Sequence, residues 1–196
     1  MLRISAIVMA SGMSKRMNRD KLHMKINGKC IYEYILETIK DCDFHETVVV
    51  AKDDDILRKA RSLGYLAERN TRNFIGQSES IKIALKNISP ADGYMFFVAD
   101  QPFIKVETVK KLCIMFSKNS NRIVVPYYNG IKGSPVIFPY SLKSQLMSLE
   151  NDQGGTTIIN SNKHMVLSVN IQTECENLDI DTMEDYNKAI NIFDRE

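Results

Sequence analysis

The chain reads ISAIVMASGMSKRMNRDK over residues 4–21. Residues 4–10 are almost entirely apolar, as in a buried β-strand, and small residues follow directly. A loop with so little side-chain bulk lets backbone N–H groups approach an anion closely, and Arg16 and Lys21 add fixed positive charge beside it. An apolar strand that feeds such a loop predicts a phosphate site at the edge of a parallel sheet, which makes the chain a candidate nucleotide-handling enzyme.

Two common nucleotide motifs are absent from this loop, since neither G-x-x-x-x-G-K-[ST] nor G-x-G-x-x-G occurs. Gly12 permits a tight backbone path and Ser14 offers a hydroxyl. The guanidinium of Arg16 can bind two phosphate oxygens, while Lys21 can act as a mobile charge that follows developing phosphate charge. A solvated basic loop explains the same residues, and spacing alone does not separate the two interpretations.

Apolar runs and helical patterns alternate along the rest of the chain. Strands are predicted at 3–9, 47–51, 65–67, 94–99, 122–126, 134–138 and 165–169, and helices at 31–41, 54–62, 77–88, 105–117, 141–149, 155–161 and 182–193. This alternation predicts an α/β fold, a mostly parallel, Rossmann-like sheet with helices on both faces, in a single domain over residues 1–196. Ligands of such sheets bind beyond the carboxyl ends of the strands.

Composition argues against several classes of protein. With 44% hydrophobic and 26% charged residues and a net charge of +2, the chain has no global preference for nucleic acid or a membrane surface. It contains no apolar run long enough to span a bilayer. Its four cysteines are scattered without a C-x-x-C motif, so we expect free thiols and a cytoplasmic location. The three histidines lack metal-ligand spacing, so zinc is not expected.

Two groups of carboxylates are candidates for metal binding. Asp100 directly follows an apolar strand, where its burial is costly without a partner, and Mg²⁺ carrying substrate phosphates would be such a partner. The alternative is that Asp100 caps the next helix. Asp179 and Asp181 lie on one side of an extended segment, which suits a shared divalent ion. Capping of the last helix by Asp181 or Thr182 is the alternative that this segment alone favours.

Three polar loops also follow or precede predicted elements. Gln77 and Ser78 stand ahead of a helix, where they can meet a base or ribose or simply form a helix cap. Gly133 and Ser134 precede a strand and are also compatible with an ordinary turn. Residues 151–156, which include Asp152 and Gly154, form either a helix N-terminus that faces an anion or a plain cap.

Together, these segments resemble the MobA-like nucleotidyltransferases, a group that includes the molybdenum-cofactor cytidylyltransferases. Six motifs carry the resemblance, in the same order and over essentially the whole chain. Residues 9–17 (MASGMSKRM) with Lys21-Leu22 match the family's L-A-A-G-x-S-x-R-M-G…K-L; 76–81 (GQSESI) resemble G-x-S-x-S-L; 99–102 (ADQP) match [AG]-D-x-P; 133–138 (GSPVIF) resemble G-x-P-V-x-F; 151–155 (NDQGG) resemble G-D-x-G-A; and 179–186 (DIDTMEDY) match D-I-D-T-P-E-D-Y.

The resemblance implies transfer of a nucleoside monophosphate from a nucleoside triphosphate to a phosphate-bearing acceptor, with release of pyrophosphate. Carried over position by position, it implies nucleotide binding by Ala10, Ser11, Gly12, Ser14, Arg16, Lys21, Gln77 and Ser78, catalysis by Arg16, Lys21 and Asp100, Mg²⁺ binding by Asp100 and Asp181, and acceptor binding by Gly133, Ser134, Asp152 and Gly154. The acceptor's phosphate is already a nucleophile, so no nucleophilic triad is needed.

Departures from the family pattern bear on substrate choice. Asn18 and Asn151 replace glycines of the family motifs, and Thr156 stands where a basic residue is usual, which affects the expected acceptor contacts. At the position that separates cytidine-type from guanosine-type members the chain has Ser11, whose Cβ is closer to the cytidine type. We therefore expect CTP, a molybdopterin-type acceptor, and a molybdenum hydroxylase as possible recipient of the product. GTP, a sugar phosphate or other small phosphorylated acceptor, and a non-catalytic cofactor carrier are the alternatives.

Overall fold

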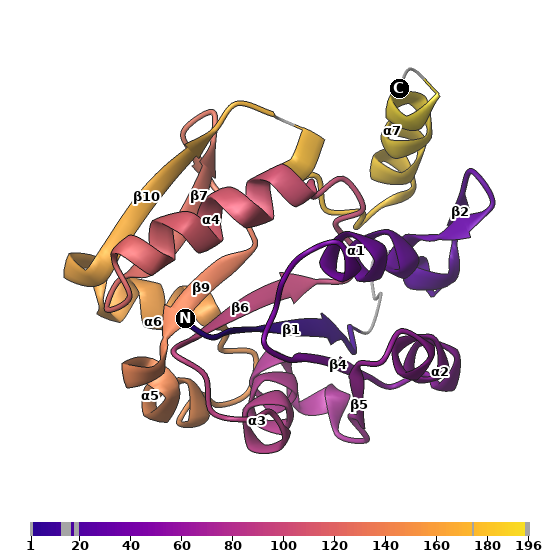
Figure 1. The fold of residues 1–196 in the computed structure, drawn as a ribbon. Helices are drawn as coiled ribbons and strands as arrows, with labels where there is room; N and C mark the ends of the chain where they lie inside the picture. Colours follow the sequence, from indigo (N-terminus) through magenta and orange to yellow (C-terminus); the bar gives the residue numbers. More distant parts are fainter. Residues whose placement is uncertain (1, 13–16, 18–19, 174, 195–196) are drawn as a thin grey trace.

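The computed structural model describes residues 2–12, 17, 20–173 and 175–194. Strands of its main sheet are β1 (Ile4–Ala10), β4 (Thr47–Ala51), β5 (Leu66–Arg69), β6 (Gly93–Val98), β7 (Ile123–Tyr128), β8 (Ile131–Lys132), β9 (Val136–Pro139) and β10 (Val166–Ile171). Helices are α1 (Ile31–Lys40), α2 (Asp54–Ser62), α3 (Gln77–Asn87), α4 (Val106–Lys118), α5 (Lys143–Met147), α6 (Gly155–Ser161) and α7 (Met183–Phe193) (Figure 1). No helix among these described residues is both long and apolar enough to cross a membrane.

The strand order is β10-β7-β9-β6-β1-β4-β5, with β8 paired to β7 beside this path. Strand β1 is central and runs parallel to both β4 and β6, and its last residues pair with the last residues of those strands: Ala10 with Ala51 and Met9 with Val98. The carboxyl ends of all three strands therefore meet at one edge of the sheet. The prediction of a mostly parallel sheet is confirmed, with the addition that β9 runs antiparallel to its neighbours β6 and β7.

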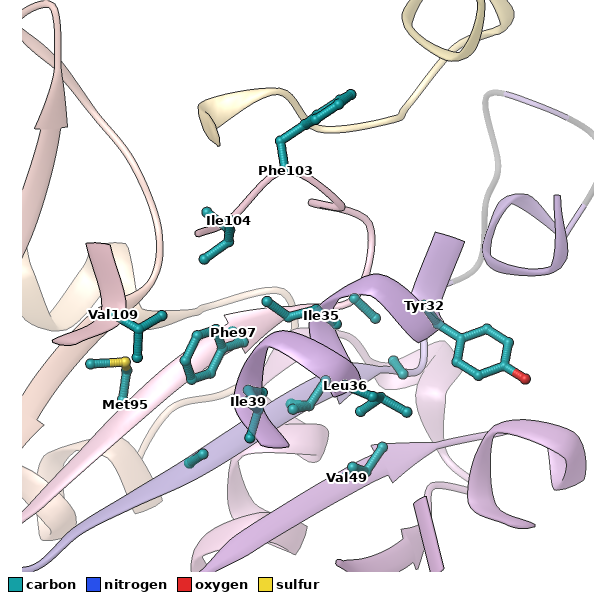
Figure 2. Close-up of a cluster of buried hydrophobic side chains, with 14 of the residues drawn as sticks. Tyr32, Ile35, Leu36, Ile39, Val49, Met95, Phe97, Phe103, Ile104 and Val109 are labelled. Carbon is teal, nitrogen blue, oxygen red and sulfur yellow. The ribbon is translucent and has the colours of Figure 1, made fainter. Parts of the chain in front are cut away.

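Apolar side chains alternate between the two faces of the central strands, so each face has its own core. On one face, Val8, Val49 and Phe97 belong to the core that packs against α1, α2 and α4, and Figure 2 shows Phe97 in this cluster beside Ile35 and Ile39 of α1. On the other face, Ile7 and Val50 pack with α3, α5 and α6. Helices on both faces explain why β1, β4 and β6 are apolar almost throughout, as predicted.

Local sequence signals account for several element boundaries. Helix α2 begins at Asp54 because the side chain of Asp53 caps it and accepts a hydrogen bond from the backbone N–H of Asp55. Strand β4 and helices α2 and α6 have the predicted limits, whereas the helix predicted at 141–149 is shorter: a single 3₁₀ turn precedes α5. The structure also adds a two-stranded ribbon of β2 (Lys25–Ile26) and β3 (Lys29–Cys30), which was not predicted.

Candidate active site

A cavity of about 390 Å³ lies at the edge of the sheet where β1, β4 and β6 end. Its walls include the small-residue loop after β1, the segment after β6 and the start of α3. Its lining residues are Met9, Ala10, Ser11, Gly12, Lys21, Leu22, Asn73, Gly76, Gln77, Ser80, Val98, Ala99, Asp100, Asp152 and Asp181. Ser14 and Arg16, which the sequence marks as candidates, lie outside the described residues.

Lys21 is a nearly buried cation held between two carboxylates from distant parts of the chain. Its Nζ donates to Asp100 and, over 2.8 Å, to Asp181, and its side chain is only 9% exposed. The backbone N–H of Ile180 also donates to the carbonyl of Asp100 over 3.1 Å, which ties the two carboxylate-bearing segments together. Desolvation opposes the charge of Lys21, but the two carboxylates outweigh it and the pKa of Lys21 is raised.

The segment before α7 carries a third carboxylate beside this ion pair. Partial desolvation, followed by the negative charges of Asp100 and Asp181, raises the pKa of Asp179 to about 6, although the residue is still exposed. A hydrogen bond from Gln101 works in the opposite direction. Helix capping in this segment is done by Thr182, which accepts from the backbone N–H of Asp185, so Asp181 is left to bind Lys21.

The arrangement at Asp100 fits a divalent cation. Asp100 does not cap α4, because that helix begins at Val106 with Lys105 as its N-cap. One of its carboxylate oxygens, Oδ1, is buried and finds no hydrogen-bond partner within the described part of the chain. A buried, unpaired carboxylate oxygen is costly unless a ligand satisfies it, and carboxylate oxygens are what Mg²⁺ prefers.

A second group of side chains that could hold a metal ion consists of Asp20, His23 and Asp53. Nδ1 of His23 is 3.3 Å from Asp20 and its Nε2 is 3.4 Å from Asp53. Both carboxylates already cap helices, through the backbone N–H groups of Leu22 and Asp55. The group therefore links the segment that carries Lys21 to the start of α2. Sequence spacing did not reveal it, because Asp53 joins only through the fold.

The wall formed by α3 differs in part from the sequence expectation. Gln77 lines the cavity, but Ser78 does not: it is 1% exposed. Ser80 lines the cavity instead, because residues three apart share one side of a helix. Nδ2 of Asn73 donates to the carbonyl of Ser11 over 3.3 Å. Helical spacing from Gln77 would have been enough to identify Ser80.

Residues 151–155 pack directly on the start of α3. The backbone N–H of Ser78 donates to the carbonyl of Asn151 over 3.2 Å. A Cβ on Gly154 would collide with Oε1 of Gln77 as that side chain now lies, so the glycine lets Gln77 keep this position. This packing places Asp152 in the wall of the 390 Å³ cavity. The resemblance implied acceptor binding for Asp152, but the residue lines the same cavity as the candidate nucleotide-binding residues.

A smaller cavity of about 110 Å³ adjoins the first and shares Met9, Gln77 and Val98 with it. Gly133 and Ser134 line this second cavity, so the structure separates them from Asp152. Most of its other walls are apolar. They comprise Ile81, Phe96, Val136, Phe138, Leu146 and Ile159, with Lys132, Gly155 and Thr156 completing the lining.

The sheet order, together with a site at the carboxyl ends of the central strands, defines a nucleotidyltransferase fold. Residues 6–166 match the family model of the MobA-like NTP transferase domain, so the chain belongs to that family.

Individual relatives are distant. A probable molybdenum cofactor guanylyltransferase from Natranaerobius thermophilus is 30% identical over 128 residues, which make up 65% of this chain and 62% of that protein. The chain therefore matches less than two thirds of that relative's length. The purine catabolism protein PucB from Bacillus subtilis is 23% identical, with 92% of each chain covered. The structure of Rv0371c from Mycobacterium tuberculosis H37Rv in complex with manganese has a TM-score of 0.80 at 21% identity, over 96% of this chain and 98% of that one.

Proposed function

We propose that this chain, as one domain over residues 1–196, transfers a nucleoside monophosphate from a nucleoside triphosphate to a phosphate-bearing acceptor and releases pyrophosphate. The observation that carries the proposal is Lys21, held between Asp100 and Asp181 in the wall of a cavity at the ends of β1 and β6. A buried cation beside an unsatisfied carboxylate oxygen suits a site for a metal-bound polyphosphate.

The chain's own residues would align the reaction and stabilise its charge. The loop of Ala10, Ser11 and Gly12 offers backbone N–H groups to the triphosphate, and Arg16 and Lys21 add positive charge. The acceptor's phosphate attacks the α-phosphorus, and pyrophosphate leaves from the opposite side. No proton abstraction by a protein base is required, so catalysis rests on positioning and on stabilising the negative charge.

Mg²⁺ would be held by Asp100 and Asp181. When bound, the ion supplies charge neutralisation for the triphosphate and the leaving pyrophosphate. Lys21 then has a second role, since its ion pairs hold the two carboxylates close together and limit their mutual repulsion.

Ser11 favours CTP as the substrate. Ser11 is one of the residues that line the cavity, and its hydroxyl donates to the carbonyl of Val50 over 3.1 Å, which fixes the orientation of its side chain. GTP is the second candidate, because three relatives are named as probable molybdenum cofactor guanylyltransferases. For the acceptor we propose a molybdopterin-type phosphate, whose product would pass to a molybdenum hydroxylase.

Pyrophosphate release tests the proposal. The purified chain is incubated with Mg²⁺, a molybdopterin acceptor and CTP, GTP or ATP in turn, and we expect release with CTP above the others. No release with any nucleotide would contradict enzymatic transfer. Tight nucleotide binding, seen as a raised melting temperature, without any turnover would instead support a non-catalytic carrier.

Exchanging Ser11 for glycine should shift base selectivity. Removal of the Cβ widens the cavity wall, so we expect the ratio of kcat/KM for GTP to that for CTP to rise about tenfold. Ser11→Ala is the matched control, because it removes only a hydroxyl that faces Val50, and it should leave the ratio unchanged. An unaltered ratio in Ser11→Gly would show that residue 11 does not select the base.

A further inference from the structure

The small cavity beside the candidate nucleotide site contains one charged side chain among the described residues that line it, that of Lys132. Lys132 is partly buried, and its ammonium has no hydrogen-bond or ion-pair partner within the described ranges. An ammonium that no carboxylate of the described residues pairs with can form charge-assisted hydrogen bonds to an anionic ligand at the cavity wall.

The position of Lys132 follows from a tight hairpin. Asn129 and Gly130 both have positive φ, 49° and 82°, which is the geometry of a two-residue turn between β7 and β8. The turn pairs Lys132 with Tyr127 across the hairpin, and the backbone N–H of Gly133 donates to the carbonyl of Pro126 over 3.0 Å. These backbone contacts hold the base of Lys132 in place at the cavity wall.

Apart from Lys132, the cavity is lined mainly by apolar side chains, with Gln77, Ser134 and Thr156 as its polar residues. Phe96, Val136, Phe138 and Ile159 form its walls, and its volume of about 110 Å³ is close to that of a cavity of about 150 Å³ known to hold benzene. A flat ring or short apolar group would fit against the apolar side chains, whereas the many hydroxyl groups of a sugar would have to share Gln77, Ser134 and Thr156.

We propose that Lys132 binds the phosphate of the acceptor and that this cavity receives a ring-sized apolar group of the same molecule. The inference rests on the proposed nucleotidyl transfer and narrows its acceptor to phosphate monoesters with an apolar or aromatic portion, against hydroxyl-rich sugar phosphates. Because the two cavities share Met9, Gln77 and Val98, a phosphate at their boundary would reach the nucleotide side.

Binding of simple phosphate monoesters tests this assignment. The full chain is first loaded with Mg²⁺ and a non-reacting α,β-methylene analogue of the nucleoside triphosphate. It is then titrated with phenyl phosphate, glycerol 1-phosphate and inorganic phosphate in a calorimeter. We expect phenyl phosphate to bind at least about tenfold more tightly than glycerol 1-phosphate. Equal affinities, or no binding of phenyl phosphate, would overturn the apolar part of the proposal.

Substitutions test the role of Lys132 and the role of the apolar cavity wall separately. Lys132→Gln should weaken phenyl phosphate and inorganic phosphate alike by about tenfold or more, and Lys132→Arg should largely restore both. Lys118→Gln, at an exposed lysine at the end of α4, is the control and should change neither. Val136→Thr, nearly isosteric, should weaken phenyl phosphate only. Unchanged phosphate affinity in Lys132→Gln would overturn the role of the lysine.

The same titrations on the nucleotide-free chain distinguish the two proposals. If no nucleotide binds but phenyl phosphate still binds through Lys132, nucleotidyl transfer fails while the anion site stands. If nucleotide turnover is normal but Lys132→Gln leaves the KM of the acceptor unaltered, the acceptor site lies elsewhere.

Discussion

Replacing Asp100 by asparagine should reduce nucleotidyl transfer by at least about 100-fold while the fold is kept. The substitution removes the negative charge that faces Lys21 and takes away a charged oxygen from the buried Oδ1 position. Stability should fall by no more than about 2 kcal/mol, because Lys21 keeps Asp181 at 2.8 Å and the amide oxygen can still accept a hydrogen bond. The measurements are pyrophosphate release at saturating Mg²⁺ and urea unfolding.

Asp92 provides a control at the other end of the same strand. It stands just before β6, and its carboxylate accepts from the backbone N–H of Arg3 over 2.7 Å. Asp92→Asn should leave turnover within about twofold of the wild type, since the site lies where the strand ends. Turnover in Asp100→Asn equal to that of the control would show that Asp100 does not hold the metal.

Sequence alone was sufficient for the elements that carry strong local signals. Strand β4, a buried run of β-branched residues, and helix α2, with a capping aspartate and one apolar side, have the predicted limits. The direction of β9 was not predictable in the same way, because apolar residues at 134–138 show that a strand is buried but not which way it runs. The ribbon of β2 and β3 is too short to leave a periodic signal.

The same distinction, between local sequence signals and contacts made only in the folded chain, applies to the candidate site. Residues directly after strands, such as Ser11 and Asp100, were predictable because parallel strands bring their carboxyl ends to one edge. Contacts between segments far apart in the chain were not: Lys21 joins Asp100 and Asp181 only in the folded chain. The prediction also named Ser78, whereas Ser80 lines the cavity, and the helical spacing from Gln77 would have distinguished the two.

Gly76→Ala should be the most destabilising single-atom change near the site. Gly76 has φ of +130° and ψ of −168°, a region that only glycine occupies readily, and this backbone strain costs about 1–3 kcal/mol for other residues. A Cβ would also lie 2.5 Å from the carbonyl carbon and oxygen of Asn151, which are backbone atoms and cannot rotate away. Together these effects should lower the free energy of unfolding by about 3 kcal/mol or more.

The same collision should impair the site, because it pushes residues 151–155 away from α3 and so displaces Asp152 and Gln77. Gly64→Ala separates strain from collision: Gly64 has φ of +81°, but no atom lies within 4 Å of the position that a Cβ would take there. We expect that variant to lose only about 1–2 kcal/mol and to keep its KM for the nucleotide. Denaturant unfolding and the KM for the nucleotide, measured on both variants, show whether the collision adds to the backbone strain. Equal losses of stability, with nucleotide KM unchanged in both, would mean that the loop at 151–155 does not depend on close contact with Gly76.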